Sequence, residues 1–178
     1  MAEVSGDRIR DFLQRSDVEQ DSMKKGRLLE DLICYLFEDI PGITITIRNE
    51  LDAFRAGEID VAFFNEKHPD GLFFVDHFVL VECKNWSDPV GSSEVAWFDR
   101  KLQDRGLKEG ILVALNGITG DPTRLSSAQN IVAGALRAGR RIVLITRKEI
   151  EAIERTDQIV HLLKRKLLTL HAKRTSCA

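Results

Sequence analysis

The spacing of apolar residues changes repeatedly along the chain, and each change predicts a structural element. A helical spacing, with apolar residues three or four positions apart, predicts six helices. They fall within the first twenty residues, at 23–40, around Val95–Leu102, from Ser126 or Ser127 to about Ala138, at 148–154 and at about 157–172. The Pro41-Gly42 pair is expected to end the second helix, since proline cannot continue it.

Five segments between these helices predict β-strands, because their apolar residues either alternate with polar ones or form short continuous runs. They are 43–51, 58–64, 78–84, 110–115 and 140–146, and residues 52–57 are expected to form a turn between the first two. The nearly continuous apolar run at 78–84 favours a central position in a sheet. Three successive strands followed by strand–helix–strand crossovers predict an α/β fold with a mixed central sheet of about five strands, flanked by helices.

Composition is that of one soluble globular domain. The chain has 178 residues, of which 43% are hydrophobic and 30% charged. No run of about 18 apolar residues predicts a membrane-spanning helix, and the N-terminus lacks the apolar stretch of a signal peptide, so we expect a cytoplasmic protein that does not bind membranes. Cys34, Cys83 and Cys177 form no C-x-x-C pair, and the four histidines show no metal-ligand spacing, which argues against disulfides and zinc.

Charge is distributed unevenly. Residues 137–178 contain 11 Lys or Arg and 4 Asp or Glu, a net charge of +7, whereas the preceding part carries 15 and 24, a net charge of −9. A basic C-terminal part is a plausible surface for phosphate groups, although a solvated helix face explains the same charges.

The third strand ends in residues that are costly to bury. Alternation places Leu80, Glu82 and Lys84 on one face, with Glu82 and Lys84 about 7 Å apart. Asp60 lies on the preceding strand, and antiparallel pairing would bring it opposite Glu82. Two carboxylates held so close repel each other, and a divalent cation with a preference for oxygen ligands, Mg²⁺ or Mn²⁺, would offset this repulsion.

Such a centre is suited to phosphodiester hydrolysis, because a metal ion polarises a phosphoryl oxygen and lowers the pKa of bound water. Asp60 and Glu82 would then be metal ligands, and the backbone carbonyl of Cys83 a further one. Lys84 would orient or deprotonate the water, or neutralise charge on the phosphate. The Cys83 side chain is expected to point into the core.

Three motifs resemble the PD-(D/E)xK nuclease superfamily and, more narrowly, its Mrr-type restriction endonuclease domains. They are Gly26–Glu30 on the first long helix, Gly57–Val61 on the second strand and Val81–Trp86 on the third. Segments 110–113, 127–128 and 141–145 fit the same family, so that the resemblance covers roughly Met23 to Ile150.

The resemblance implies a restriction-endonuclease-like fold and assigns roles to four residues, Glu30, Asp60, Glu82 and Lys84. Asp60, Glu82 and Lys84 match the catalytic motif, and Glu30 on the first long helix would join Asp60, Glu82 and the Cys83 carbonyl in holding metal. Residues 1–178 would form one nuclease domain, with its core at about 23–150 and a basic helical extension at about 151–178. Two departures are Ile59, where the superfamily's nominal proline would stand, and the lack of room for the separate DNA-reading domain that Mrr restriction enzymes usually carry.

The expected function is therefore a Mg²⁺-dependent DNA endonuclease in restriction or phage defence, with Mn²⁺ as a substitute. DNA would be its partner, along with a separate recognition protein and, for cutting two strands, a second copy of the chain. A nuclease for junctions or repair intermediates is one alternative, and a catalytically inactive nucleic-acid-binding module of the same fold is another. A structural Glu–Lys pair at a sheet edge would explain the motif without any activity.

Other residues are weaker candidates for the site, and each also has an ordinary structural explanation. Glu58 shares the face of Asp60 and is either a further ligand or an exposed strand end. Trp86 is either a base-stacking residue or an anchor for its loop. The candidate phosphate contacts are Lys101, Arg105 and 164–166, each of which a solvated surface would also explain.

Overall fold

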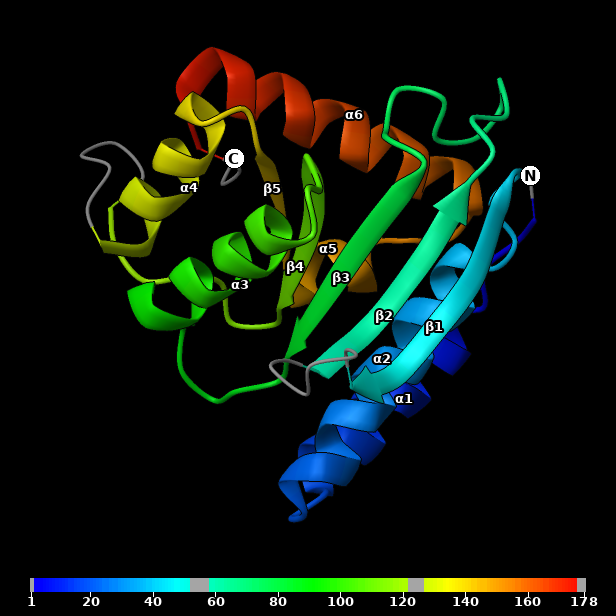
Figure 1. Cartoon of the computed structure of the whole chain (residues 1–178). Coiled ribbons are helices and arrows are strands. Elements are labelled where there is room, and N and C mark those ends of the chain that lie inside the picture. Colours follow the sequence, from blue (N-terminus) through cyan, green and yellow to red (C-terminus); the bar gives the residue numbers. More distant parts are fainter. Residues whose placement is uncertain (1, 52–57, 122–126, 176–178) are drawn as a thin grey trace.

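A five-stranded mixed sheet forms the centre of the computed structural model, which describes residues 2–51, 58–121 and 127–175 (Figure 1). Its strands, in spatial order as in chain order, are β1 (Ile43–Leu51), β2 (Glu58–Asn65), β3 (Phe78–Lys84), β4 (Glu109–Ala114) and β5 (Arg141–Ile145). The β1–β2 and β2–β3 pairs are antiparallel, whereas β3–β4 and β4–β5 are parallel. The predicted α/β fold with a mixed sheet is confirmed.

Helices cover both faces of this sheet (Figure 1). One face carries α1 (Gly6–Val18), α2 (Ser22–Phe37), α5 (Arg147–Glu151) and α6 (Thr156–Lys173), and the other carries α3 (Ser92–Asp104) and α4 (Ser127–Arg137). The alternation within β3 separates two clusters of buried residues accordingly. Val79, Val81 and Cys83 pack in the cluster with α1, α2, α5 and α6, while Leu80 packs in the cluster with α3 and α4.

Most element boundaries lie within a few residues of those expected. The helix expected at 23–40 ends instead at Phe37, and residues 38–42 form the turn into β1. At its other end, α2 is capped by Asp21, whose side chain accepts hydrogen bonds from the N–H groups of Met23 and Lys24. This N-cap satisfies two otherwise unpaired donors. The expected turn at 52–57, the alternative cap Ser126 and Cys177 lie outside the described residues.

The final helix is part of the core. Buried Ile159, Leu163 and Leu167 of α6 pack in the same cluster as α1 and α2, so this segment covers the sheet. Cys34 and Cys83 are buried free thiols. Among the described residues, no helix is long and apolar enough to cross a membrane.

Close packing of α3 on β4 depends on Gly110. A Cβ atom at this position would lie 2.6 Å from Cζ of Phe98 and 2.9 Å from Cδ2 of Leu102, well inside van der Waals contact. The absent side chain therefore lets α3 approach the sheet, and this approach brings Lys101, between Phe98 and Leu102 in sequence, close to the end of β3.

Gly110→Ala should destabilise the protein by about 1–3 kcal/mol, because an extra methyl group in a filled core forces its neighbours to move. Chemical denaturation monitored by circular dichroism would measure this. Gly134→Ala in α4 is the matched control, since its Cβ would have only Arg137 Nη2 nearby, at 3.7 Å. It should be neutral or stabilising by up to about 1 kcal/mol through helix propensity. Equal effects of the two substitutions would show that α3 does not depend on Gly110 for its position.

Candidate active site

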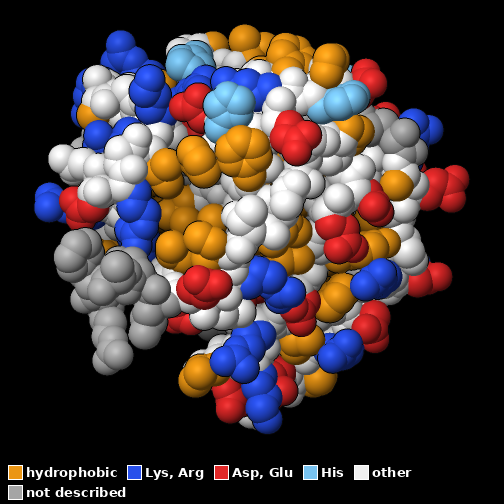
Figure 2. Space-filling model, turned by 45° about the vertical axis from the view of Figure 1, so that its right-hand side comes forward, with side chains coloured by type: hydrophobic (Ala, Val, Ile, Leu, Met, Phe, Trp, Pro, Cys, Tyr) orange, Lys and Arg blue, Asp and Glu red, His pale blue; other side chains and the backbone are white. Residues whose placement is uncertain are grey.

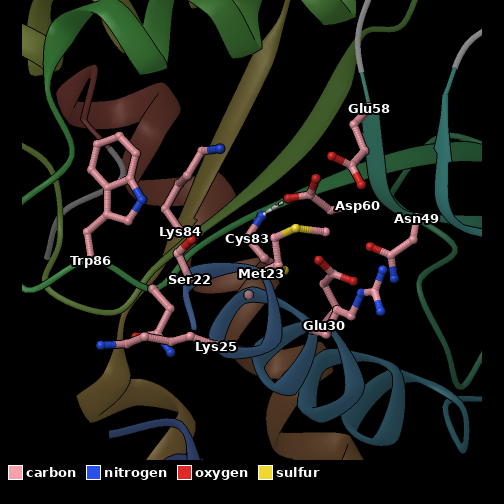
Figure 3. Close-up of a pocket in the computed structure, with 13 residues that line it drawn as sticks. Ser22, Met23, Lys25, Glu30, Asn49, Glu58, Asp60, Cys83, Lys84 and Trp86 are labelled. Atoms are coloured by element: carbon pink, nitrogen blue, oxygen red, sulfur yellow. Dashed lines mark hydrogen bonds between the residues drawn. The ribbon is translucent and has the colours of Figure 1, made fainter. Parts of the chain in front are cut away.

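A pocket of about 270 Å³ opens where the first half of α2 meets the ends of β1, β2 and β3. Figure 3 shows Glu30, Asp60, Glu58 and Asn49 grouped on one side of it, and Lys84 on the other side. The sequence-predicted residues Glu30, Asp60, Cys83 and Lys84 therefore meet around one pocket, although they come from three separate elements.

Asp60 lies where β2 and β3 stop pairing. The last pair of their ladder is Val61 opposite Val81, and one further step would place Asp60 opposite Glu82. Asp60 instead accepts a hydrogen bond of 2.7 Å from the backbone N–H of Cys83. Burial and the negative charge of Glu82 raise the pKa of Asp60 to about 6, although the Cys83 N–H, Lys84 and Lys101 act in the opposite direction.

The backbone carbonyl of Cys83 faces the same side as Asp60. The N–H of Cys83 points to β2, whereas the carbonyl of the next residue, Lys84, points to β4 and accepts from Leu115 at 3.3 Å. The N–H and C=O groups of one strand residue point the same way, so the Cys83 carbonyl is directed toward β2. Its thiol packs in the core as expected, and burial raises the thiol pKa well above its ordinary value.

Glu30 is a buried carboxylate on α2 with incomplete hydrogen bonding. Only 6% of the residue is exposed, and its Oε2 atom has no hydrogen-bond partner. Burial raises the pKa of Glu30 to about 7. A hydrogen bond from Asn49 acts to lower this pKa, and the negative charge of Asp60 acts to raise it further. A buried carboxylate oxygen without a partner is costly, and a cation in the pocket would supply one.

Glu82 is buried beside the pocket and is held by two lysines. Lys84 Nζ lies 2.9 Å from its Oε1 atom, and Lys101 Nζ lies 2.7 Å from its Oε2 atom. Burial lowers the pKa of Lys84, but the charge and hydrogen bond of Glu82 and the charge of Asp60 outweigh this, so the pKa lies above its ordinary value. Lys84 is therefore protonated at neutral pH.

The donor set fits a hard divalent cation, although the carboxylates are spread out. Glu30, Asp60 and the Cys83 carbonyl offer oxygen atoms to the pocket, which Mg²⁺ and Mn²⁺ prefer. Within the described part of the chain, no three His, Cys, Asp or Glu side chains are grouped closely enough to hold a metal ion. Glu82 would have to exchange its contact with Lys84 for the ion, so its metal role stays a prediction.

Two weaker candidates also line the pocket. Glu58 is exposed, and Trp86 is 44% exposed, at the end of the pocket occupied by Lys84 (Figure 3). The side chain of Asn116 donates to the Trp86 carbonyl at 2.6 Å, which fixes the loop after β3. Lys84 Nζ lies 5.9 Å from the centre of the Trp86 ring, within cation–π range.

Two candidate phosphate contacts prove to be buried. Lys101 is only 6% exposed and binds Glu82, and Lys166 is only 3% exposed and lies 2.5 Å from Glu149, so neither can face a phosphate as placed. Arg105 donates to the Lys101 carbonyl at 3.3 Å. A sequence signal for Lys101 existed, since it lies three residues after Phe98 on the apolar face of α3.

The basic C-terminal part forms many internal ion pairs. Arg147 makes two hydrogen bonds to Asp17 on α1, and Arg155 binds Asp157. On the face shown in Figure 2, Lys and Arg side chains are interspersed with Asp and Glu. The net positive charge of residues 137–178 therefore does not form one continuous basic surface on that face.

A nuclease domain of the restriction-endonuclease type is defined by two features together. One is the mixed sheet with its helices, and the other is the acidic pocket with an adjacent lysine at the end of β3. The Mrr_cat family model, described as restriction endonuclease, matches residues 21–153, and the chain belongs to this family. No curated protein matches the chain significantly. The family match confirms the resemblance seen in the motifs, and it ends just before α6.

Glu30→Gln should stabilise the metal-free protein at neutral pH. The folded-state pKa of about 7 exceeds the ordinary value of 4.5, so ionisation of Glu30 opposes folding. This penalty is absent below about pH 4.5, grows as pH rises and is complete above about pH 7. The variant should therefore gain up to about 3 kcal/mol at pH 8 and much less at pH 5.

Urea unfolding in the presence of EDTA at both pH values would measure the gain. Glu66→Gln, at an exposed carboxylate in the loop after β2, is the control and should change neither value. A gain that is the same at pH 5 and pH 8 would contradict a raised pKa at Glu30.

Proposed function

We propose that this protein is a Mg²⁺-dependent endonuclease that hydrolyses phosphodiester bonds in DNA. The observation that carries the proposal is the pocket itself. Within the family-matching region it brings together Asp60, Lys84 and the buried carboxylate of Glu30, which has an unpaired oxygen. Such an oxygen is unfavourable in the free protein and becomes useful when a cation binds.

Four groups would hold the ion: the carboxylates of Glu30, Asp60 and Glu82, and the backbone carbonyl of Cys83. Bound Mg²⁺, or Mn²⁺ in its place, would polarise a phosphoryl oxygen and lower the pKa of a bound water. A cation would also favour the ionised forms of Glu30 and Asp60, whose pKa values are raised in its absence.

Lys84 is assigned to the phosphate. Its raised pKa keeps it protonated at neutral pH, so it is suited to neutralise negative charge on the reacting phosphoryl group and poorly suited to remove a proton from water. With 23% of its side chain exposed at the pocket, it can move from Glu82 toward a substrate. The expected reaction is in-line attack by water, leaving a 5′-phosphate.

Restriction or phage defence is the biological role that best matches a nuclease domain of this family. One active site cuts one strand, so cleavage of both strands of a duplex requires a second site, for which a homodimer is the simplest source. A separate recognition protein would supply sequence specificity. Cleavage of junctions or repair intermediates is the alternative role, and a panel of duplex, single-stranded and branched DNA would separate the two.

Lys84→Ala should reduce the rate of DNA cleavage by at least about 100-fold, in line with the loss of a group that stabilises transition-state charge. Plasmid nicking and cleavage of labelled single-stranded and branched DNA, with Mg²⁺ or Mn²⁺, would measure this. Lys108→Ala is the matched control, because this exposed lysine precedes β4 at the opposite end of the sheet. Identical behaviour of wild type and Lys84→Ala on every substrate would favour an inactive nucleic-acid-binding module.

Asp60→Asn and Glu82→Gln should each weaken Mn²⁺ binding by at least about tenfold, since even residues that only support metal ligands contribute that much. Isothermal titration calorimetry without DNA would detect this independently of activity. Asp70→Asn, at an exposed loop carboxylate, should bind like wild type. Unchanged affinity in both site variants would remove these carboxylates from the metal site.

A further inference from the structure

Lys101 makes contacts that link three elements next to the pocket. It projects from α3, and its Nζ atom lies 2.7 Å from Glu82 Oε2 on β3 and 2.8 Å from the carbonyl oxygen of Glu58 on β2. Both side chains of the Lys101–Glu82 pair are nearly inaccessible, with 6% and 4% exposed. A buried ion pair of this kind requires good geometry, because both charges have lost their water.

The contact with Glu58 lies where the two carboxylate-bearing strands separate. The β2–β3 ladder ends at Val61 opposite Val81, and beyond it the hydrogen bond from the Cys83 N–H to Asp60 joins the two strands. Lys101 bonds to both strands past that point. It therefore fixes the spacing of β2 and β3 at Asp60 and Glu82, and it places a positive charge beside two carboxylates that repel each other.

The two oxygens of Glu82 are bound on different sides. Lys101 binds Oε2 on the side of α3, while Oε1 is bound by Lys84, whose side chain lines the pocket. Under the proposed function, departure of Lys84 to a substrate phosphate would free Oε1, while Oε2 would stay with the buried Lys101.

We propose that Lys101 is a positioning residue that directs the Oε1 atom of Glu82 toward the metal pocket. The inference rests on the proposed metal-dependent nuclease function and adds to it a residue outside the three sequence motifs. Gly110 belongs to the same arrangement, since the close approach of α3 to β4 that it permits brings Lys101 to Glu82.

Lys101→Met tests the inference, because methionine has a similar length and no charge. We expect Mn²⁺ affinity by calorimetry without DNA to fall about 10-fold or more and kcat to fall about 10- to 100-fold, as is usual when a partner of a metal ligand is removed. The KM for DNA should stay within about twofold, since Lys101 is buried away from the substrate. The matched control is Arg100→Met on the same helix, which breaks only an exposed pair with Asp104 and should leave all three values unchanged.

Thermal unfolding separates positioning from a purely structural role. A structural lysine would lower Tm by several degrees in Lys101→Met and leave the Mn²⁺ affinity and kcat of the folded protein at wild-type values, and that result would overturn the inference. If Lys101→Met does not fold, Lys101→Gln takes its place with the same readouts, because its amide can donate to one of the two acceptors. Wild-type protein that neither binds Mn²⁺ nor cleaves DNA would instead refute the proposed function, and the inference with it.

Discussion

Burial of carboxylates, together with the repulsion between them, is the constraint around which this site is built. Glu30, Asp60 and Glu82 come from three elements and lie near the same end of the sheet, where burial strengthens charge–charge interactions. Different groups offset each charge. A backbone N–H of β3 binds Asp60, two lysines bind Glu82, and Asn49 is the hydrogen-bond partner of Glu30, one of whose oxygens has none. The compensation is therefore most complete at Glu82 and least complete at Glu30.

This uneven compensation has a thermodynamic consequence. The pKa values of Asp60 and Glu30 are raised by burial and by neighbouring negative charge, so the metal-free fold is less stable at neutral pH than it would be without these groups. A cation that binds only the folded protein would recover that stability by mass action. Local destabilisation and ligand binding are then two consequences of the same geometry, as is common where a site conflicts with the rules that stabilise the rest of a fold.

The sequence predicted the sheet and the position of Asp60 well because both follow from local patterns. Alternation along Phe78–Lys84 separates two faces, and antiparallel pairing places Asp60 beside the end of that strand, as the register shows. The contact between Glu82 and Lys101 was beyond this reasoning, since Lys101 arrives from a helix whose approach depends on Gly110. The spacing of Lys101 from Phe98 placed it on the buried face of α3, but it did not reveal which acceptor the lysine would bind. Charge counts failed for Lys166 for the same reason, because a count does not reveal an ion pair with Glu149.

The two lysines on Glu82 differ in burial and in the other groups that they contact, which supports different tasks under the proposed function. Lys84 is two residues along the same strand, lines the pocket and has 23% of its side chain exposed, so under the proposed function it is the lysine that would exchange Glu82 for a phosphate. Lys101 is 6% exposed and also bonds to the β2 backbone, so releasing it would cost the buried Glu82 Oε2 atom its ion pair and the Glu58 carbonyl its hydrogen bond from Lys101. In this structure α3 contributes the buried lysine, and the end of β3 contributes the lysine that lines the pocket.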